Sequence, residues 1–400
     1  MKPEPFPKIL FVTQTRMYRQ QGDTIHVAEV VQELARCGVS VTLIASGKPI
    51  QPLEGVRYID GGKVRPGPFV IRFISFLIHT LITLYHVIRY SGQVDVLYTR
   101  DALLGFWLWL LHPLIGLPVV FEANGLRGVE KGMYIGGKIG QRVGQIISGM
   151  ERIIARHASA LVCVTPGIRG MIHQRYGVAL NRMVVVPNGV NLQVFRPAED
   201  KKKIATLKQS LNLRNNDAVI FFVGGLKPWV DFNILLQSVD SLQLAERNPV
   251  LLIVGDGFKQ NSIEAKIRTL NHPERIVMTG AVPYHEVPNY IALADVCTMP
   301  FTVERNREIG LSPLKLFSYL ACGKPIVATK IDGFEFLEEE KMGSLVPIGD
   351  AEAFAAAMKD WLEKPVDREE QRLRIRSYAE AHCGWDRTAR CVLEVCKGVV

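Results

Sequence analysis

The sequence lacks the marks of a secreted or disulfide-bonded protein. Its seven cysteines are an odd number, lie scattered along 400 residues and form no CxxC pair, which excludes a disulfide scaffold and a zinc-finger pattern. The N-terminus reads MKPEPFPKILFVTQT, and its apolar run is too short for a secretory signal. We therefore expect a cytoplasmic protein with buried, reduced thiols.

Several catalytic motifs are also missing. The chain contains no GxSxG elbow, no P-loop, no HExxH and no Asp-x-Asp pair. These absences argue against a serine hydrolase, a P-loop NTPase, a zincin and a metal site built on paired carboxylates. We expect neither a metal nor a cofactor.

What the chain does have is an excess of positive charge. It carries 48 Lys and Arg against 39 Asp and Glu, a formal charge of +9, which favours acidic partners. The basic residues are dispersed except for the run at Lys201–Lys203, and no RNA-binding aromatic signature is present. We expect no nucleic acid as partner, which leaves phosphates and an anionic membrane.

Residues 69–88 form a long apolar stretch, with 14 apolar positions among 20. Its polar residues follow at steps of three or four, so a helix would carry most of them on one stripe, which does not suit a spanning helix. Two interpretations remain open. The segment is a core helix whose stripe faces solvent, or it lies on the cytoplasmic face of a membrane and attaches the protein peripherally. The stripe comprises Arg72, Ser75, His79, Thr83 and His86.

Short β-branched runs alternate with helical stretches in two successive series, which predicts an α/β fold of two Rossmann-like, doubly wound parallel-sheet domains. The first series is KILFVTQT, VSVTLIAS, VDVLYTR, PVVFEAN, ALVCVTP and MVVVPNG, and the second is AVIFFVGG, VLLIVGDG, IVMTG, VCTMP and PIVAT. We place an N-terminal domain at 1–195 and a C-terminal domain at 196–379, with a helix at about 380–400 packing back on the first. The ligand is expected between the two halves, at the carboxyl ends of the strands.

The segment EIGLSPLKLFSYLACGKPIVAT, which begins at Glu308, predicts a short helix with an anion site at its start. Ser312 suits the N-cap, Pro313 the first helical position and Gly323 the residue just past the end. The amides at the helix start and the charge of Lys315 would favour a phosphate there. The alternative is an ordinary capped helix with a solvated lysine.

Three glycine-containing segments add weaker signals. Gly224 and Gly225 end a strand and are followed by Lys227, which would face the same phosphate at the sheet edge. Gly22 precedes a helix after the first strand, although a lone glycine is often only a turn. VGDGFKQ is an incomplete dinucleotide fingerprint and indicates little by itself.

Four motifs in order then give a resemblance that covers most of residues 8–395. The chain resembles the family 4-type (group 1) retaining glycosyltransferases of the GT-B fold, in which two Rossmann-like domains hold a nucleotide sugar. The matching stretches are VVVPNGVNLQVFRP, VGGLKPWVDFNILL, GAVPYHEVPNYIALADVCTMP and GLSPLKLFSYLACGKPIVA.

The resemblance implies a transferase that moves a sugar from a nucleotide donor to a glycan or lipid-linked acceptor with retention of anomeric configuration. It implies catalytic roles for Lys227, Glu308 and Asn124. Asn124 stands where many relatives have histidine, and Ser318 stands where the family normally has a glutamate that holds the ribose hydroxyls. The implied donor-binding residues are Gly22, Gly225, Ser312, Pro313, Leu314, Lys315 and Ser318.

Two rival functions stay open on the sequence alone. One is a family member that has lost turnover and acts as a binding or scaffolding protein, which the serine at Ser318 and Val230 in the lysine loop suggest. The other is a nucleotide-sugar epimerase with the same fold, against which the SPLK and KPW segments argue.

Overall fold

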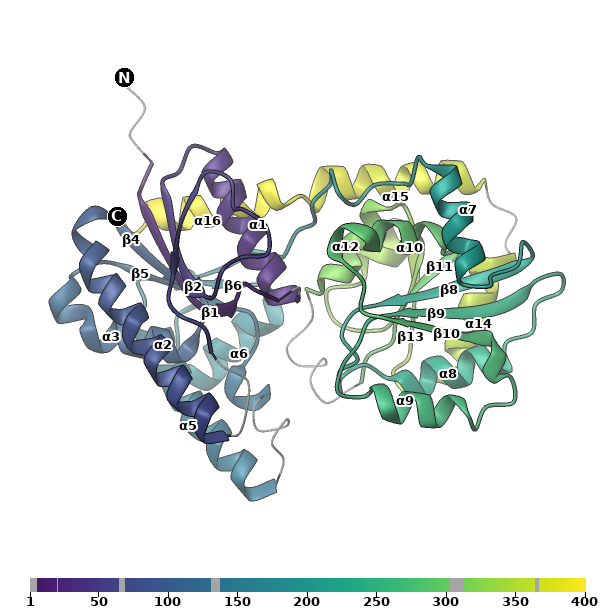
Figure 1. Cartoon of the computed structure of the whole chain (residues 1–400), viewed down its shortest axis with the longest axis horizontal. Coiled ribbons are helices and arrows are strands. Elements are labelled where there is room, and N and C mark those ends of the chain that lie inside the picture. Colours follow the sequence, from purple (N-terminus) through teal and green to yellow (C-terminus); the bar gives the residue numbers. More distant parts are fainter. Residues whose placement is uncertain (1–5, 20, 65–68, 131–136, 303–311, 364–366) are drawn as a thin grey trace. The chain divides into compact units, whose positions relative to one another are not determined.

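The computed structural model describes residues 6–19, 21–64, 69–130, 137–302, 312–363 and 367–400. The chain forms two compact units, Met1–Asn188 with Trp385–Val400 and Gly189–Gly384 (Figure 1). Each unit is a parallel sheet with helices around it, which confirms the predicted α/β class and the GT-B architecture of two Rossmann-like sheets.

The first unit has a seven-stranded sheet of order β3-β2-β1-β4-β5-β6-β7. Its strands are β1 (Ile9–Arg16), β2 (Val41–Ser46), β3 (Val56–Asp60), β4 (Val96–Thr99), β5 (Val119–Ala123), β6 (Ala160–Cys163) and β7 (Met183–Val185). Its helices are α1 (Gly22–Arg36), α2 (Phe69–Tyr90), α3 (Ala102–Ile115), α5 (Gly137–His157), α6 (Pro166–Tyr176) and α16 (Trp385–Lys397).

The second unit has a six-stranded sheet of order β10-β9-β8-β11-β12-β13. Its strands are β8 (Asp217–Val223), β9 (Asn248–Val254), β10 (Ile276–Gly280), β11 (Val296–Met299), β12 (Ile326–Thr329) and β13 (Gly343–Val346). Its helices are α7 (Lys201–Ser210), α8 (Phe232–Ser241), α9 (Gln260–Ile267), α10 (Val287–Leu293), α12 (Leu314–Ala321), α13 (Phe336–Glu339), α14 (Ala351–Glu363) and α15 (Arg368–His382).

The two sheets wind outward from a central pair of strands, β1 with β4 and β8 with β11. In such sheets the loops after the central strands diverge to opposite faces and leave room for a ligand at the carboxyl edge. The inner strands are buried along most of their length because both faces of a parallel sheet are covered. The topology therefore marks one candidate ligand position in each unit.

The division of the chain lies after Asn188, whereas the sequence placed it after residue 195. The intervening residues are tied to the second unit. The Val190 amide donates to the Cys383 carbonyl at 2.8 Å, and the Phe195 side chain is buried in the second core. The Arg376 guanidinium also donates to the Phe195 carbonyl at 2.5 Å. The C-terminal α16 packs on α1 and β6 of the first unit, with Trp385 buried.

The middle of the polar stripe of α2 faces the protein, so the interpretation of a core helix whose stripe faces solvent is wrong. Ser75, His79 and Thr83 are all buried. His79 Nδ1 lies 2.7 Å from the Gly61 carbonyl oxygen, which gives the buried ring a hydrogen-bond partner. No helix in the described part of the chain is long and apolar enough to cross a membrane.

Candidate active site

The best candidate site of the second unit lies where β8 and β11 part. Gly224 to Lys227 follow β8 directly, and α12 lies between β11 and β12 in the chain. The Tyr319 hydroxyl of α12 accepts a 2.9 Å hydrogen bond from the Val223 amide at the end of β8. Tyr319 is fully buried and packs edge-on against Phe221, so α12 is fixed to the end of this strand.

The start of α12 differs by one residue from the prediction. The helix begins at Leu314 and its N-cap is Pro313, not Ser312. Pro313 has ψ of 131°, an extended conformation typical of an N-cap, and its carbonyl accepts from the Leu316 amide at 3.0 Å. The end of the helix is as predicted, since Gly323 lies just past Cys322 with φ of +69°. The amides that open α12 thus follow Pro313.

Lys315 and Lys227 both lie against the glycine pair at the end of β8. A methyl group added to Gly224 would stand 3.2 Å from Lys315 Nζ, and one added to Gly225 would stand 2.9 Å from Lys227 Cε. Lys315 Nζ also lies 3.6 Å from the centre of the Phe222 ring, a cation–π contact. The structure therefore brings the two lysines predicted for the site, Lys227 and Lys315, to one glycine turn.

The surroundings of Lys315 disfavour its charge. Desolvation by burial lowers the pKa of Lys315 to about 7, far below the usual lysine range. The cation–π contact with Phe222 offsets part of this cost. An anion placed beside Nζ would supply the missing counter-charge, so the site is electrostatically suited to a phosphate.

The VGDG segment after β9 has a structural explanation. A methyl group added to Gly255 would lie 2.1 Å from the Gly224 carbonyl oxygen, so only glycine allows this approach of the two loops. The Leu226 amide donates to the Asp256 carbonyl at 2.8 Å and completes the contact. Gly255 thus lets the loop after β9 pack closely against the turn Gly224–Lys227.

Ser318 is buried on α12 and donates its hydroxyl to the Leu314 carbonyl at 3.0 Å. The hydroxyl is thus engaged within the helix, one turn from Lys315. Glu308 lies outside the described residues, so its predicted role stays a prediction. Gly22 is the first residue of α1 in the first unit and is exposed at the helix start.

Asn124 belongs to a buried polar cluster at the carboxyl edge of the first sheet. Its side-chain amide donates to Glu122 Oε1. The Tyr98 hydroxyl donates to Glu122 Oε2 at 2.6 Å, and Arg100 Nε lies 3.8 Å from Oε1. Burial alone raises the pKa of Glu122, but His26, Arg100 and Tyr98 outweigh it and hold this pKa well below its usual range.

His26 links this cluster to two other parts of the first unit. Its Nε2 lies 2.9 Å from Glu122 Oε1, and its Nδ1 lies 2.7 Å from Asn188 Oδ1. The Trp385 ring of α16 meets the imidazole edge-on at 5.2 Å. Neither His26 nor Glu122 was among the residues predicted for the site. A carboxylate inside the apolar run VVFEAN was the signal that could have shown this cluster.

The fold and these sites define a class of protein. It has two doubly wound α/β units, and the second unit places two lysines, suited to bind an anion, at the carboxyl ends of its central strands β8 and β11. Two family models match the chain, Glycosyltransferase Family 4 over residues 21–194 and Glycosyl transferases group 1 over residues 217–364.

Individual relatives agree with these matches. A D-inositol 3-phosphate glycosyltransferase of Kineococcus radiotolerans is 26% identical over 411 residues, covering 95% of this chain and 91% of the relative. Anabaena HepE, solved in complex with UDP-glucose, has a TM-score of 0.76 at 16% identity and covers 98% of this chain and 100% of that one. Sucrose-phosphate synthase from Thermosynechococcus elongatus has a TM-score of 0.79 at 19% identity, covering 98% of each chain.

The chain belongs to the group 1, family 4 glycosyltransferases. It is a retaining, nucleotide-sugar-dependent glycosyltransferase, as the four sequence motifs implied.

Proposed function

We propose that Lys227, Lys315 and the first amides of α12 hold the diphosphate of the sugar donor. The observation that carries this assignment is the contact of both lysine side chains with Gly224–Gly225, at the dividing point of the second sheet. Helix-start amides and lysine ammonium groups both favour an anion. The glycine pair leaves room for phosphate oxygens to approach the backbone.

This arrangement supplies what the departing diphosphate needs. When the sugar–phosphate bond breaks, negative charge builds on the leaving oxygen, and fixed positive groups stabilise it without reorganisation. Two ammonium groups and the helix start meet that need with no metal in the proposed mechanism. A diphosphate beside Lys315 also favours its protonated form, so binding draws a proton to this side chain near neutral pH.

The proposed donor is UDP-glucose, because HepE was solved in complex with it. The proposed acceptor is a hydroxyl of a glycan or of a lipid-linked compound, met at the cytoplasmic, anionic surface of a membrane. The net charge of +9 supports such a partner. Asn124, held by Glu122, is proposed to contact the reacting sugar.

Calorimetric titration with UDP, GDP and CDP tests the donor assignment, and incubation with UDP-glucose followed by detection of released UDP tests turnover. We expect UDP to bind and Lys315→Ala to weaken it. The matched control is Lys202→Ala. Lys202 is the second residue of α7, as Lys315 is of α12, so the control removes a lysine side chain from the same position of another helix. Equal loss in both variants, or no loss at Lys315, would overturn the assignment.

A further inference from the structure

The side of α2 that points away from the first unit is apolar. Its large side chains, spaced at helical intervals, are exposed between 43% and 66% of their area, and we call them the outer face of α2. A folded protein gains nothing by leaving such a contiguous apolar strip in water. The outer face comprises Ile71, Ile74, Leu77, Ile78, Leu81, Tyr85 and Ile88.

Hydrogen bonds on the inner side hold α2 in this rotation. His79 Nδ1 is 2.7 Å from the Gly61 carbonyl oxygen, and the side-chain amide of Gln14 donates to the Thr80 hydroxyl at 3.3 Å. Turning the helix to bury its apolar side would break these bonds and strand buried polar groups. The outward apolar side is therefore a built feature of the fold.

A hollow of about 420 Å³ opens on the same strip. It is lined by Gly62 and Lys63 and by five residues of α2, namely Ile71, Ile74, Ser75, Ile78 and His79. The hollow is a mainly apolar recess beside Lys63. Such a recess suits flexible chains with anionic head groups better than a flat, rigid partner.

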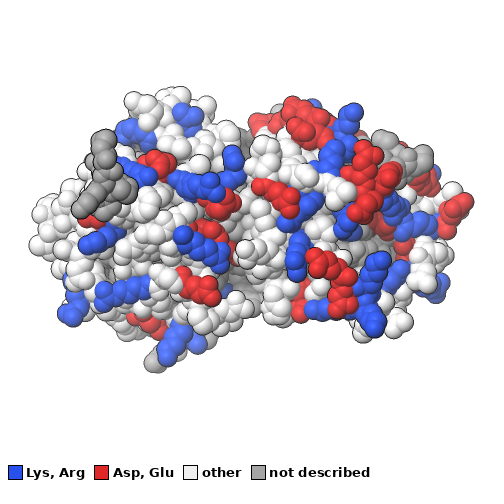
Figure 2. Space-filling model, turned by 90° about the horizontal axis from the view of Figure 1, so that it is seen from above, with Lys and Arg blue, Asp and Glu red and all other residues white. Residues whose placement is uncertain are grey.

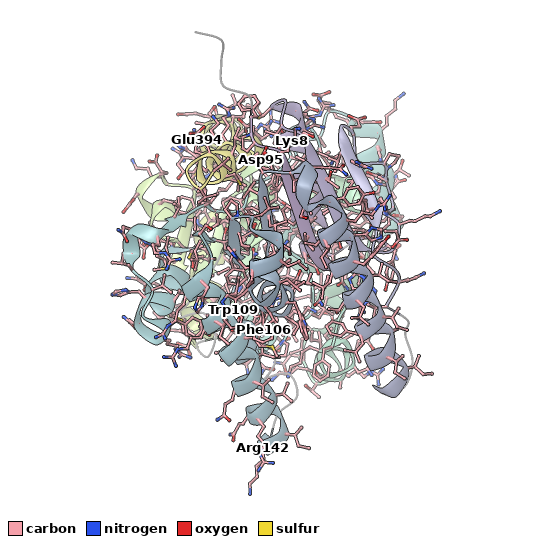
Figure 3. The ribbon with its side chains drawn as sticks, turned by 90° about the vertical axis from the view of Figure 1, so that its left-hand side faces the viewer. Lys8, Asp95, Phe106, Trp109, Arg142 and Glu394 are labelled. Carbon is pink, nitrogen blue, oxygen red and sulfur yellow. The ribbon has the colours of Figure 1, made fainter. Side chains whose placement is uncertain are left out.

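The neighbouring helices extend the apolar strip and add only positive charge. α3 packs beside both α2 and α5, and Figure 3 looks onto this side of the first unit. α3 carries no charged lysine, arginine or acid, and exposes Leu110 and Leu114. On α5, Ile139, Arg142 and Ile146 follow at steps of three and four, so they share one side of the helix.

Across α2, α3 and α5 the only acidic residue is Glu151, which is buried. Exposed basic residues, by contrast, mark both charged helices: Arg89 on α2, and Lys138, Arg142, Arg152 and Arg156 on α5. The acidic Asp95 and Glu394 lie at the opposite end of the view from Arg142 (Figure 3).

The charge of the whole chain is concentrated in this unit. The first unit has 24 Lys and Arg against 13 Asp and Glu, or +11, and the second has 24 against 26, or −2. In Figure 2 acidic side chains gather mainly over the second unit. An apolar strip bordered by cations, on helices that expose no acidic residue, matches a surface that offers both acyl chains and anionic headgroups.

We propose that the outer face of α2, with the basic residues of α5 beside it, docks the first unit onto an anionic lipid bilayer. α2 lies in the plane of the interface with its apolar side chains among the acyl chains. This inference rests on the proposed function, in which the acceptor lies at an anionic membrane, and it specifies the surface of the protein that contacts that membrane. Pairing of two copies through this face is disfavoured, because it would bring two basic borders together.

Flotation on a density gradient tests the proposal. The probes are vesicles of phosphatidylcholine alone and of phosphatidylcholine with phosphatidylglycerol, at low and high salt. The wild-type protein should float with the anionic vesicles and less so at high salt. Ile78→Asp/Leu81→Asp places charge at positions 52% and 66% exposed, so the fold should persist while vesicle affinity falls at least about tenfold.

Leu373→Asp is the matched control, because this leucine is 54% exposed on α15 of the second unit; it should float like the wild type. Lys138→Glu/Arg142→Glu should lower binding to the anionic vesicles and remove its salt dependence. The proposal is overturned if the wild type stays in the dense fraction, or if the α2 double variant floats unchanged. It is also overturned if sedimentation shows that the wild type is a dimer and the α2 double variant is a monomer.

UDP titration of the same proteins without vesicles separates the two hypotheses. Loss of flotation with normal UDP affinity would touch only the docking surface. Normal flotation without UDP binding would contradict only the proposed donor site.

Discussion

Replacing Lys315 by methionine should make the ligand-free protein more stable and at the same time remove its diphosphate site. The side chain is half-buried on α12 beside Phe222, where desolvation lowers its pKa to about 7. Methionine keeps the length and the contact with the ring but carries no charge to desolvate. A residue that costs stability in the free protein is expected where its partner is a ligand.

The magnitude follows from the pKa. A fall from 10.5 to about 7 corresponds to about 5 kcal/mol against the charged form, as an upper bound. The cation–π contact returns about 1–2 kcal/mol, and residual solvent access at a half-buried site reduces the cost further. We therefore expect Lys315→Met to stabilise the second unit by about 1–3 kcal/mol, or about 2–4 °C in Tm for each kcal/mol.

The pH dependence has a definite sign. Because the folded pKa lies below the unfolded one, protonation favours the unfolded chain. The loss of folding stability caused by Lys315 is absent above pH 10.5, grows as the pH falls toward about 7 and is constant below that. Differential scanning calorimetry of the transition that UDP shifts in the wild type should show the largest gain near pH 6 and a smaller one near pH 9.

UDP titration of the same variant supplies the second half of the test. Affinity should fall about ten- to a hundredfold, the value of one charge-assisted hydrogen bond. A variant that is less stable than the wild type at pH 6, or that binds UDP normally, would refute the reasoning.

Substitutions at three further positions test the two sites. Lys227→Ala should weaken UDP binding about ten- to a hundredfold with an unchanged Tm, measured by calorimetry. Ser318→Glu should tighten UDP binding about tenfold by adding an acceptor for ribose hydroxyls, whereas Ser318→Ala, which loses only the bond to Leu314, should bind UDP as the wild type does. Glu122→Gln should destabilise the first unit by about 2–4 kcal/mol at pH 7; because the Glu122 pKa is lowered by folding, the difference should shrink as thermal unfolding is followed into strongly acidic pH.

Most of the fold could be predicted because the inner strands of a parallel sheet are continuous apolar runs. The runs quoted from the sequence correspond to the inner strands and to β7 and β10 at two of the sheet edges. The two strands that were not predicted, β3 and β13, are the opposite edges of the two sheets. β3 is partly exposed throughout and carries Arg57 and Asp60, and β13 reads GSLV, with a glycine and a serine among its four residues, so neither gives a clear apolar run.

The orientation of α2 could not be predicted from its periodicity. A helical stripe of polar residues shows that a helix has two sides, but not which side meets the protein. The interior here offers hydrogen-bond partners, the Gly61 carbonyl and the side-chain amide of Gln14, so the polar side is the buried one. These partners come from other strands and loops and are invisible in the helix sequence.

The lysine site of the second unit and the Glu122 cluster of the first also differ in how far the sequence predicts them. Lys227 and Lys315 could be found because each follows a central strand, and the topology brings the ends of such strands together. The cluster around Glu122 could not, because His26, Asn188 and Trp385 reach it from α1, from the loop after β7 and from the far C-terminus. A carboxylate buried in an apolar strand requires partners. That requirement predicts a cluster at Glu122, while only the folded chain identifies its members.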